Sequence, residues 1–286
     1  MDDSTATQAP RSTPHHCIRM AGRLGNQLFQ YAFGRALETR TGVPVVYGDS
    51  RVQPMLRDWF PCIRARFASR MRWSHAGLRC IDVRGKADKY LPQLFTKTPT
   101  YFMGYWANER YFADISGTLR KELALPWPVD LAERDAELLS RIDRPGSVMV
   151  CTRHGGDFRA LHWTLGPHYY PRAMDYMRER VPGCRFFVFG DDTEWCEREF
   201  GHIPDAEVVG LRVQPPWWQL QVMGRCRHAI IANSTFTWWA AWLGLADSGI
   251  VVAPEPWKVV CPGITDVVCD RWVRVDSVSP YKEVKA

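Results

Sequence analysis

The strongest constraint on the fold is a unit that recurs along the chain: an apolar run, a turn of polar or glycine residues, and a helix-like segment. In the clearest copy, apolar residues 229–232 lead to Asn233, Ser234 and Thr235, and then to tryptophans at helical spacing. Strand–turn–helix units of this kind build parallel α/β sheets. The free backbone N–H groups at such a helix start suit a phosphate. An ordinary capped helix, packed by its tryptophans, explains the same stretch.

The N-terminal part contains another copy of this unit. Residues 17–20 are predicted as a strand, residues from Leu28 to about 41 as a helix, and residues 43–47 as the next strand. Between them, Gly22 and Gly25 allow a tight turn close to a ligand, and Asn26 and Gln27 offer amides at the helix start. The spacing is not GxGxxG, so it does not favour a nicotinamide or flavin cofactor. A purely structural glycine turn is the alternative.

The remaining elements divide the chain into two domains. Further strands are predicted at 101–106, 147–152, 185–189, 208–209, 229–232 and 249–254, and helices from 108, at 131–142, at 172–180, from 193 and at 217–225. Residues 50–125 alternate basic and aromatic side chains and predict an irregular region with an exposed groove. We expect a disordered tail at 1–15, a first domain at 16–145 and a second at 146–286, separated by the turn at 143–147.

Composition narrows the class of ligand. The formal charge of +6 is mild, which suits a nucleotide or an anionic membrane surface and does not by itself indicate nucleic acid.

The cysteines are nine in number and include no CxxC pair, so neither a zinc site nor a disulfide scaffold is indicated. No run has the length of a membrane span, and no signal peptide is recognised. We therefore expect a cytoplasmic protein, with peripheral membrane association as an option.

Polar clusters follow three of the predicted strands in the second half. They lie at 153–157, at 190–192 and at 233–235. Because ligands of open parallel sheets bind beyond the carboxyl ends of the strands, three clusters together predict a nucleotide-sized ligand.

Three blocks of this sequence resemble the alpha-1,2-fucosyltransferase family, glycosyltransferase family 11. Residues 22–32 (GRLGNQLFQYA) resemble the family's GGLGNQMFQYA block. Residues 187–196 (FVFGDDTEWC) are similar to its FxFSDDxxW block, and residues 233–243 (NSTFTWWAAWL) to its SNSSFSWWAAWL block. A fourth stretch, residues 151–157 (CTRHGGD), resembles the family's HxRRGD block. There Arg153 is kept, Cys151 and His154 replace a histidine and an arginine, and an extra glycine precedes Asp157.

The resemblance implies a GT-B-like fold of two Rossmann-like domains that face a central cleft. It implies inverting transfer of L-fucose from GDP-fucose to the 2-hydroxyl of a galactose-like sugar, on an oligosaccharide or lipid-linked glycan. The donor would bind the C-terminal domain, and the acceptor the N-terminal one. No further cofactor and no nucleic acid is expected. Since no DxD signature is present, we also predict that no metal is needed.

These implications give the candidate residues their roles. Arg153 would hold the pyrophosphate, and the start of the last helix would add donors from Asn233, Ser234, Thr235 and Phe236. Asp191 and Asp192 would either recognise guanine or cap a helix. Gly25, Asn26 and Gln27 would contact phosphate or fucose from the other domain. Asp157 is the candidate general base, and His154 would assist it or orient the loop.

Two other functions fit the same residues. The altered arginine loop permits a transferase that uses a different GDP-sugar. It also permits a catalytically weak protein that binds nucleotides or glycans.

Overall fold

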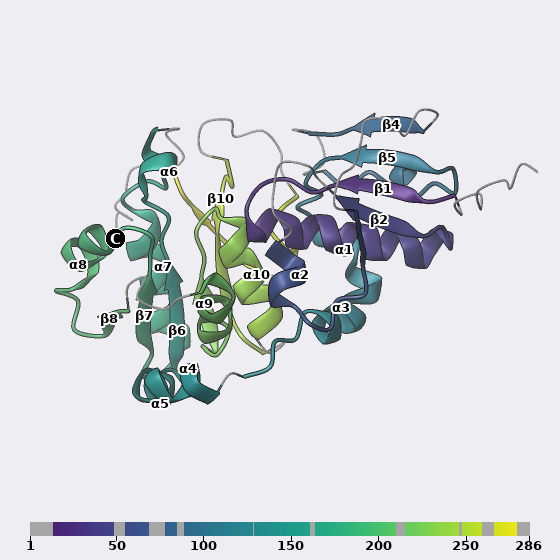
Figure 1. Cartoon of the computed structure of the whole chain (residues 1–286). Helices are drawn as coiled ribbons and strands as arrows, with labels where there is room; N and C mark the ends of the chain where they lie inside the picture. The colour runs from purple at the N-terminus through teal and green to yellow at the C-terminus, as the bar shows by residue number, and fades with distance from the viewer. Residues whose placement is uncertain are drawn as a thin grey trace, which may run out of the picture.

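The chain forms two lobes, each built on a parallel sheet (Figure 1). The computed structural model describes residues 14–48, 55–68, 78–84, 89–127, 129–160, 164–209, 215–245, 248–258 and 266–278. No helix in these ranges is both long and apolar enough to cross a bilayer.

The N-terminal lobe surrounds a five-stranded sheet of order β3-β2-β1-β5-β4, with every pairing parallel. Its strands are β1 (His16–Arg19), β2 (Val45–Gly48), β3 (Arg66–Ala68), β4 (Arg79–Asp82) and β5 (Thr100–Met103). Its helices are α1 (Leu24–Thr41), α2 (Met55–Trp59) and α3 (Ser116–Glu122), with 3₁₀ turns at Pro92–Leu94, Glu109–Tyr111 and Ala113–Ile115.

The C-terminal lobe surrounds a six-stranded parallel sheet of order β11-β10-β9-β6-β7-β8. Its strands are β6 (Ser147–Cys151), β7 (Arg185–Phe189), β8 (Ala206–Val208), β9 (His228–Ile230), β10 (Val251–Glu255) and β11 (Val273–Asp276). Its helices are α4 (Val129–Arg134), α5 (Ala136–Ile142), α6 (Gly156–Ala160), α7 (Tyr169–Arg180), α8 (Thr193–Phe200), α9 (Pro216–Met223) and α10 (Thr235–Gly244).

The strands of the C-terminal sheet send alternate side chains to two different cores. Val148, Val150, Phe186 and Val188 pack with α7 and α8 on one face. Their sequence neighbours, such as Met149 and Phe187, pack with α9 and α10 on the other. This alternation is the period of two that a strand imposes, and it explains why residues 148–151 of β6 and 186–189 of β7 are apolar throughout.

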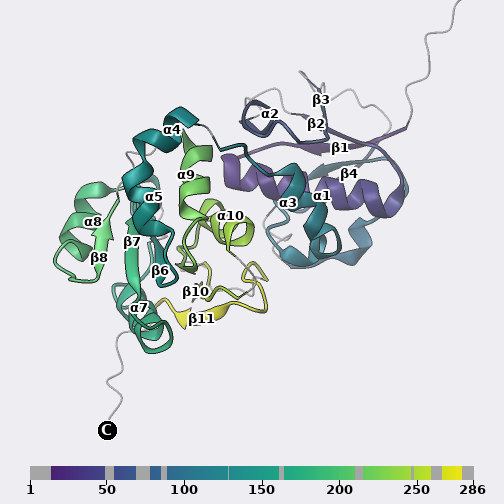
Figure 2. The same cartoon turned by 90° about the horizontal axis from the view of Figure 1, so that it is seen from below.

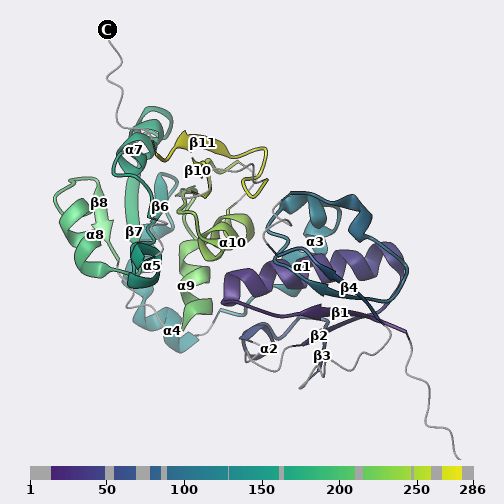
Figure 3. The ribbon, with the colours of Figure 1, turned by 90° about the horizontal axis from the view of Figure 1, so that it is seen from above.

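The second of these cores continues into the N-terminal lobe. The ring of Phe29 on α1 lies 4.6 Å from that of Trp238 and 5.0 Å from that of Trp239 on α10. Phe112 stacks on Trp239 at 5.6 Å. Figures 2 and 3 show α1 pointing with one end at α10. The two lobes therefore share one hydrophobic core instead of meeting at a wet interface.

Several predicted elements need correction. The single helix expected over 131–142 is two helices, α4 and α5, because the chain bends at Asp135, whose carboxylate accepts a hydrogen bond from Trp218 Nε1. The strand expected over 101–106 ends at Met103, and Trp106 adopts a φ of 51°. The helix predicted from Asn108 begins as 3₁₀ turns, with Asn108 capping the first. Residues 1–13 of the predicted tail lie outside the described ranges.

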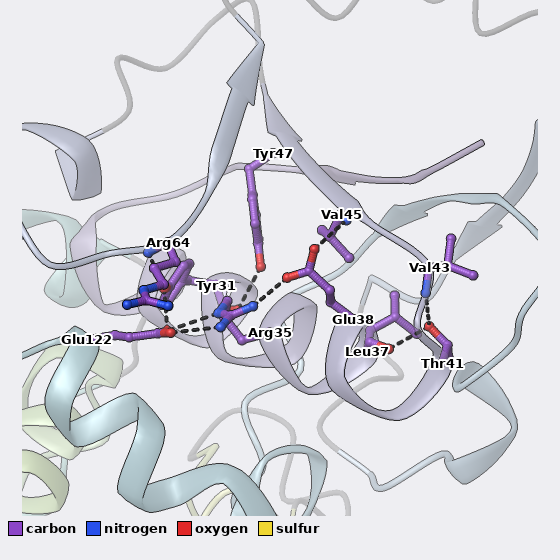
Figure 4. A network of polar contacts seen from close by, with 10 residues as sticks. All are labelled: Tyr31, Arg35, Leu37, Glu38, Thr41, Val43, Val45, Tyr47, Arg64 and Glu122. Carbon is purple, nitrogen blue, oxygen red and sulfur yellow. Dashed lines mark hydrogen bonds and ion pairs between the residues drawn. The ribbon is translucent and has the colours of Figure 1, made fainter. Parts of the chain in front are cut away.

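A buried polar network ties α1 to α3 in the N-terminal lobe (Figure 4). The Glu122 carboxylate accepts hydrogen bonds from Tyr31 Oη at 2.6 Å, from Arg35 Nε at 2.9 Å and from Arg35 Nη2 at 2.7 Å. Burial, and then the bond to Glu122, raise the pKa of Tyr31. Arg35 also pairs with Glu38, whose carboxylate accepts from Val45 N. The network fixes the position of α1.

We predict that Glu122→Ala lowers the free energy of unfolding by about 3 kcal/mol, because it leaves the Arg35 guanidinium and the Tyr31 hydroxyl without their shared partner in a buried site. Urea denaturation followed by circular dichroism measures this change. Tyr31→Phe is the comparison variant and should cost about 2 kcal/mol, because it removes two hydrogen bonds, the one to Glu122 and the one that Tyr31 Oη accepts from Arg64 N at 3.1 Å, but leaves no buried charge unpaired. Equal effects of the two substitutions would contradict the central role of the carboxylate.

Candidate functional site

The predicted site segments lie at the carboxyl ends of strands where the strand order reverses. In the C-terminal sheet the chain proceeds from β6 to β7 and β8 on one side and then returns to β9 on the other. The turns after β6 and β9 therefore flank the switch point, which is where ligands of open parallel sheets bind. In the N-terminal sheet β1 lies between β2 and β5, and the glycine turn follows β1.

Two helix starts meet across the lobes. The hydroxyl of Thr235, the first residue of α10, donates to Asn26 Oδ1 in the first turn of α1 at 3.0 Å. A Cβ atom on Gly25 would lie 2.5 Å from Phe236 N and 2.6 Å from the carbonyl carbon of Thr235. The glycine is therefore what lets the two helices come this close.

At the start of both helices, the backbone N–H groups make no hydrogen bond to the side chain of the N-cap residue. The N-cap residues are Arg23 for α1 and Ser234 for α10, and neither makes a side-chain capping bond. Neither first turn contains an acidic residue. Each helix thus presents the positive end of its dipole and its first-turn N–H groups, which together favour an anion. Ser234 thus takes the N-cap position that an ordinary capped helix would give to this stretch, but its side chain makes no capping bond.

The other predicted residues of these two turns lie around the contact. Asn233, Ser234, Thr235 and Phe236 are half-buried. Gln27 is fully buried, and its Nε2 donates to Gly22 O at 3.1 Å, so it holds the glycine turn from inside.

Asp191 holds the arginine loop in place. Its carboxylate accepts from His154 N at 2.8 Å and Gly155 N at 2.9 Å, and it forms an ion pair with Arg153. A Cβ on Gly155 would lie 2.4 Å from Asp191 Oδ2, so this arrangement requires the glycine. The extra glycine in the loop thus has a structural reason.

Asp192 is the N-cap of α8. It accepts from Trp195 N at 3.0 Å, and this bond is the main cause of a pKa below the usual value for the Asp192 carboxyl. His154 stacks on the Trp195 ring at 4.4 Å, and its Nδ1 lies 3.4 Å from Asp192 Oδ2. Asp192 was expected either to cap a helix or to recognise guanine, and the structure shows the capping bond. Guanine recognition by Asp191 or Asp192 stays a prediction.

The arginine loop and the start of α10 follow neighbouring strands. β6 pairs with β9 in the register Val150 to Ile230, so Arg153 and Asn233 each lie three residues beyond a paired position. Adjacent strands are about 4.8 Å apart. The helix α7 fixes both strand ends, because Tyr169 Oη donates to Ile231 O at 2.6 Å and Tyr170 Oη to Cys151 O at 3.2 Å. The C-terminal candidates thus form one group. Asp157 lies in α6, but its side chain is outside the described part.

Two supporting residues, Gln30 and Trp195, were not predicted from the sequence, and a third, Gly22, was predicted without its partner. The buried Gln30 accepts from Ala21 N at 3.0 Å and donates to Gly104 O at 2.9 Å, so it links the glycine turn to the segment after β5. Trp195 provides the surface on which His154 stacks. Gly22 has a φ of 77°, and the Asn26 amide occupies the space that a Cβ would need. Gln30 lies within the GNQLFQ stretch, which was the available signal.

No group of three or more His, Cys, Asp or Glu side chains that could hold a metal ion occurs in the described ranges. The cysteines that the structure describes are free thiols, and burial raises the pKa of those at the end of β6 and in α8, Cys151 and Cys196.

Comparison with known proteins connects this site to one family. The family model for glycosyl transferase family 11 matches residues 4–259. An alpha-1,2-colitosyltransferase of Escherichia coli is 31% identical over 290 residues, covering 90% of this chain and 98% of that protein. Galactoside alpha-(1,2)-fucosyltransferase 1 of Homo sapiens is 26% identical over 267 residues, covering 84% of this chain and 70% of that protein.

Solved structures share the fold at low sequence identity. A glycosyl transferase family 9 protein of Veillonella parvula superposes with a TM-score of 0.52 at 12% identity, covering 96% of this chain and 90% of the other. A mutant of FUT1 from Arabidopsis thaliana, solved with GDP, gives 0.51 at 11% identity, covering 90% and 74%. The predicted α/β, GT-B-like fold with two parallel-sheet domains is confirmed.

The matched length and the full-length similarity to the bacterial relative establish the family. The chain belongs to glycosyl transferase family 11.

Proposed function

We propose that this chain transfers L-fucose from GDP-fucose, with inversion at the anomeric carbon, to the 2-hydroxyl of a galactose-like sugar on a glycan acceptor. The names of its relatives support alpha-1,2 transfer of a deoxysugar. The three sequence blocks described above support GDP-fucose as the donor.

The observation that carries the proposal is the meeting of α1 and α10 beside the arginine loop. Departure of GDP builds negative charge on the pyrophosphate, and a preorganised set of donors lowers the barrier by stabilising that charge. The two helix starts supply N–H groups from opposite lobes, and Arg153 adds a guanidinium from the neighbouring strand end. The ion pair with Asp191 restricts the guanidinium before the donor arrives.

The remaining roles follow from this placement. Gly25 and Asn26 would serve the donor from the N-terminal lobe, and the residues at the start of α10 from the C-terminal lobe. The fully buried Gln27, predicted to contact the donor, would instead support the glycine turn. Asp157 is proposed as the general base that takes the proton of the acceptor hydroxyl. His154 would orient the loop, since its ring is held against Trp195. Arginine and helix ends supply the positive charge in this scheme, so we expect turnover without a metal.

A second donor has a specific observation in its favour. The relative that aligns over 98% of its own length is named a colitosyltransferase. Colitose differs from L-fucose by lacking the 3-hydroxyl. A site that hydrogen-bonds that hydroxyl rejects the deoxy analogue strongly, whereas an apolar site accepts both sugars. The same fold and the same Arg153 would serve either donor.

The test is release of GDP from GDP-fucose and from GDP-colitose, with and without lactose-type acceptors, in buffer containing EDTA. We expect acceptor-stimulated release that EDTA does not reduce, and an α-linked product by NMR. Faster turnover of GDP-colitose would favour the second donor. Tight GDP binding without release from either donor, with any acceptor tried, would overturn the transferase proposal in favour of a binding protein.

A further inference from the structure

The hydroxyl of Thr235 has one proton, and in the structure it donates this proton to Asn26 in the other lobe. It donates to Asn26 Oδ1 at 3.0 Å, across 209 residues of sequence. A threonine hydroxyl carries a single O–H donor. While this bond exists, Thr235 has no side-chain proton to give to a phosphate, so the phosphate contact expected from it has to come from elsewhere.

The same bond determines which way the Asn26 amide faces. With Oδ1 turned to Thr235, Nδ2 lies on the side of Gly22, 2.4 Å from where a Cβ on that glycine would be. Gly22 has a φ of 77° and no side chain, so the amide fits there. The Nδ2 group carries two donor protons, and Asn26 as a whole is half-buried, so part of this residue is accessible to a ligand.

The backbone around this bond is held closely as well. Thr235 and Phe236 lie against Gly25, and the aromatic core of Phe29, Trp238 and Trp239 lies one turn further along the two helices. The helices therefore cannot slide past one another freely. The Thr235 bond adds the one polar contact that sets the amide of Asn26 relative to the start of α10.

We propose that Thr235 is a positioning residue, which acts through Asn26. It orients the carboxamide so that Nδ2 donates to the leaving phosphate together with the first-turn N–H groups of α10. This inference rests on the proposed transfer from a GDP-sugar. It assigns Thr235 to alignment of the two lobes and assigns the side-chain donor at this point to Asn26.

The experiment compares Thr235→Val with Thr235→Ser. Valine keeps the shape and removes the hydroxyl, whereas serine keeps it. We expect Thr235→Val to lower kcat about ten-fold, which corresponds to one lost hydrogen bond at the transition state. The Kd for GDP should stay within about two-fold, because the lost bond acts on charge that develops during transfer. Thr235→Ser should recover most of the rate.

A double-mutant cycle with Asn26→Ala separates positioning from direct contact. If Thr235 acts through Asn26, then Thr235→Val changes kcat by less than about two-fold in the Asn26→Ala background, since the effects of residues that act as one unit are not additive. The control is Thr41→Val, which removes a helix hydroxyl outside the site that donates to Leu37 O and accepts from Val43 N. Its melting temperature and kcat show what loss of a local hydroxyl alone does.

These experiments distinguish failure of the positioning role of Thr235 from failure of the proposed transfer reaction. A wild-type protein that turns over no GDP-sugar defeats the proposed function. A working wild type in which Thr235→Val keeps full kcat defeats the positioning role. An equal ten-fold loss with and without Asn26 also defeats it, because Thr235 would then contact the donor directly.

Discussion

Arg153→Ala is expected to lower kcat for transfer about 10²- to 10³-fold, the effect of removing one donor from a preorganised anion site. The guanidinium lies on the loop after β6, next to the start of α10, and Asp191 holds one edge of it. Removing it takes away the only formal positive charge that we place on the pyrophosphate. Steady-state kinetics of acceptor-stimulated GDP release, with melting temperature measured in parallel, tests this.

Two companion variants identify the cause of the loss. Arg153→Lys keeps the charge and loses the planar fork that binds two phosphate oxygens, so it should recover only part of the rate. Asp191→Asn keeps an acceptor for the N–H groups of His154 and Gly155 and removes the ion pair. It should cost less than Arg153→Ala. If the two are equally slow, Arg153 acts only by holding the loop, and its placement on the pyrophosphate is wrong.

The central strands of the C-terminal sheet, such as β6 and β7, were predictable because they are buried on both faces. Runs such as residues 148–151 and 186–189 are apolar throughout, and a polar or glycine turn marks each carboxyl end. β11 was missed because it is a half-exposed edge strand, with Arg274 and Asp276 among its residues. The strands β3 and β4 were missed for the same reason, because they are short edge strands that carry exposed, polar residues.

The boundaries that failed depended on contacts distant in sequence. The helical pattern over 131–142 has nothing that forecasts a break at Asp135, since the break accompanies a bond to Trp218 on α9. Likewise Trp106 takes its unusual backbone angle where its ring stacks on Phe33 at 4.3 Å. Such tertiary contacts override local preference, and spacing alone does not contain them.

The candidate site shows the same division. Strand ends and glycine turns placed the right residues at the sheet edges, because topology alone puts them there. The contact partners of these residues could not be predicted from the sequence. Asp191 holds the arginine loop, and Thr235 donates a hydrogen bond to Asn26 in the other lobe. Composition at 233–235 favours a side-chain cap, yet the cap is absent and the Thr235 side chain serves the interface.

Gly25→Ala is expected to destabilise the protein and nearly abolish transfer, although alanine is the better helix former. The new Cβ would lie 2.5 Å from Phe236 N and 2.6 Å from the carbonyl carbon of Thr235, which are backbone atoms of α10. No rotamer change relieves that overlap, so the helices have to separate. Overpacking of this kind costs about 1–3 kcal/mol. Displacement of site groups by about 1 Å lowers rates about 100-fold.

The matched control is Gly117→Ala in α3. Both glycines are helical, but a Cβ on Gly117 meets nothing within 4 Å. Helix propensity alone then predicts a gain of up to about 1 kcal/mol for Gly117→Ala. Opposite signs in urea denaturation, together with loss of turnover only in Gly25→Ala, would place the defect at the contact between α1 and α10. If Gly25→Ala is as stable and active as the wild type, the two helix starts do not meet as closely as this, and the anion site that they form loses its geometric basis.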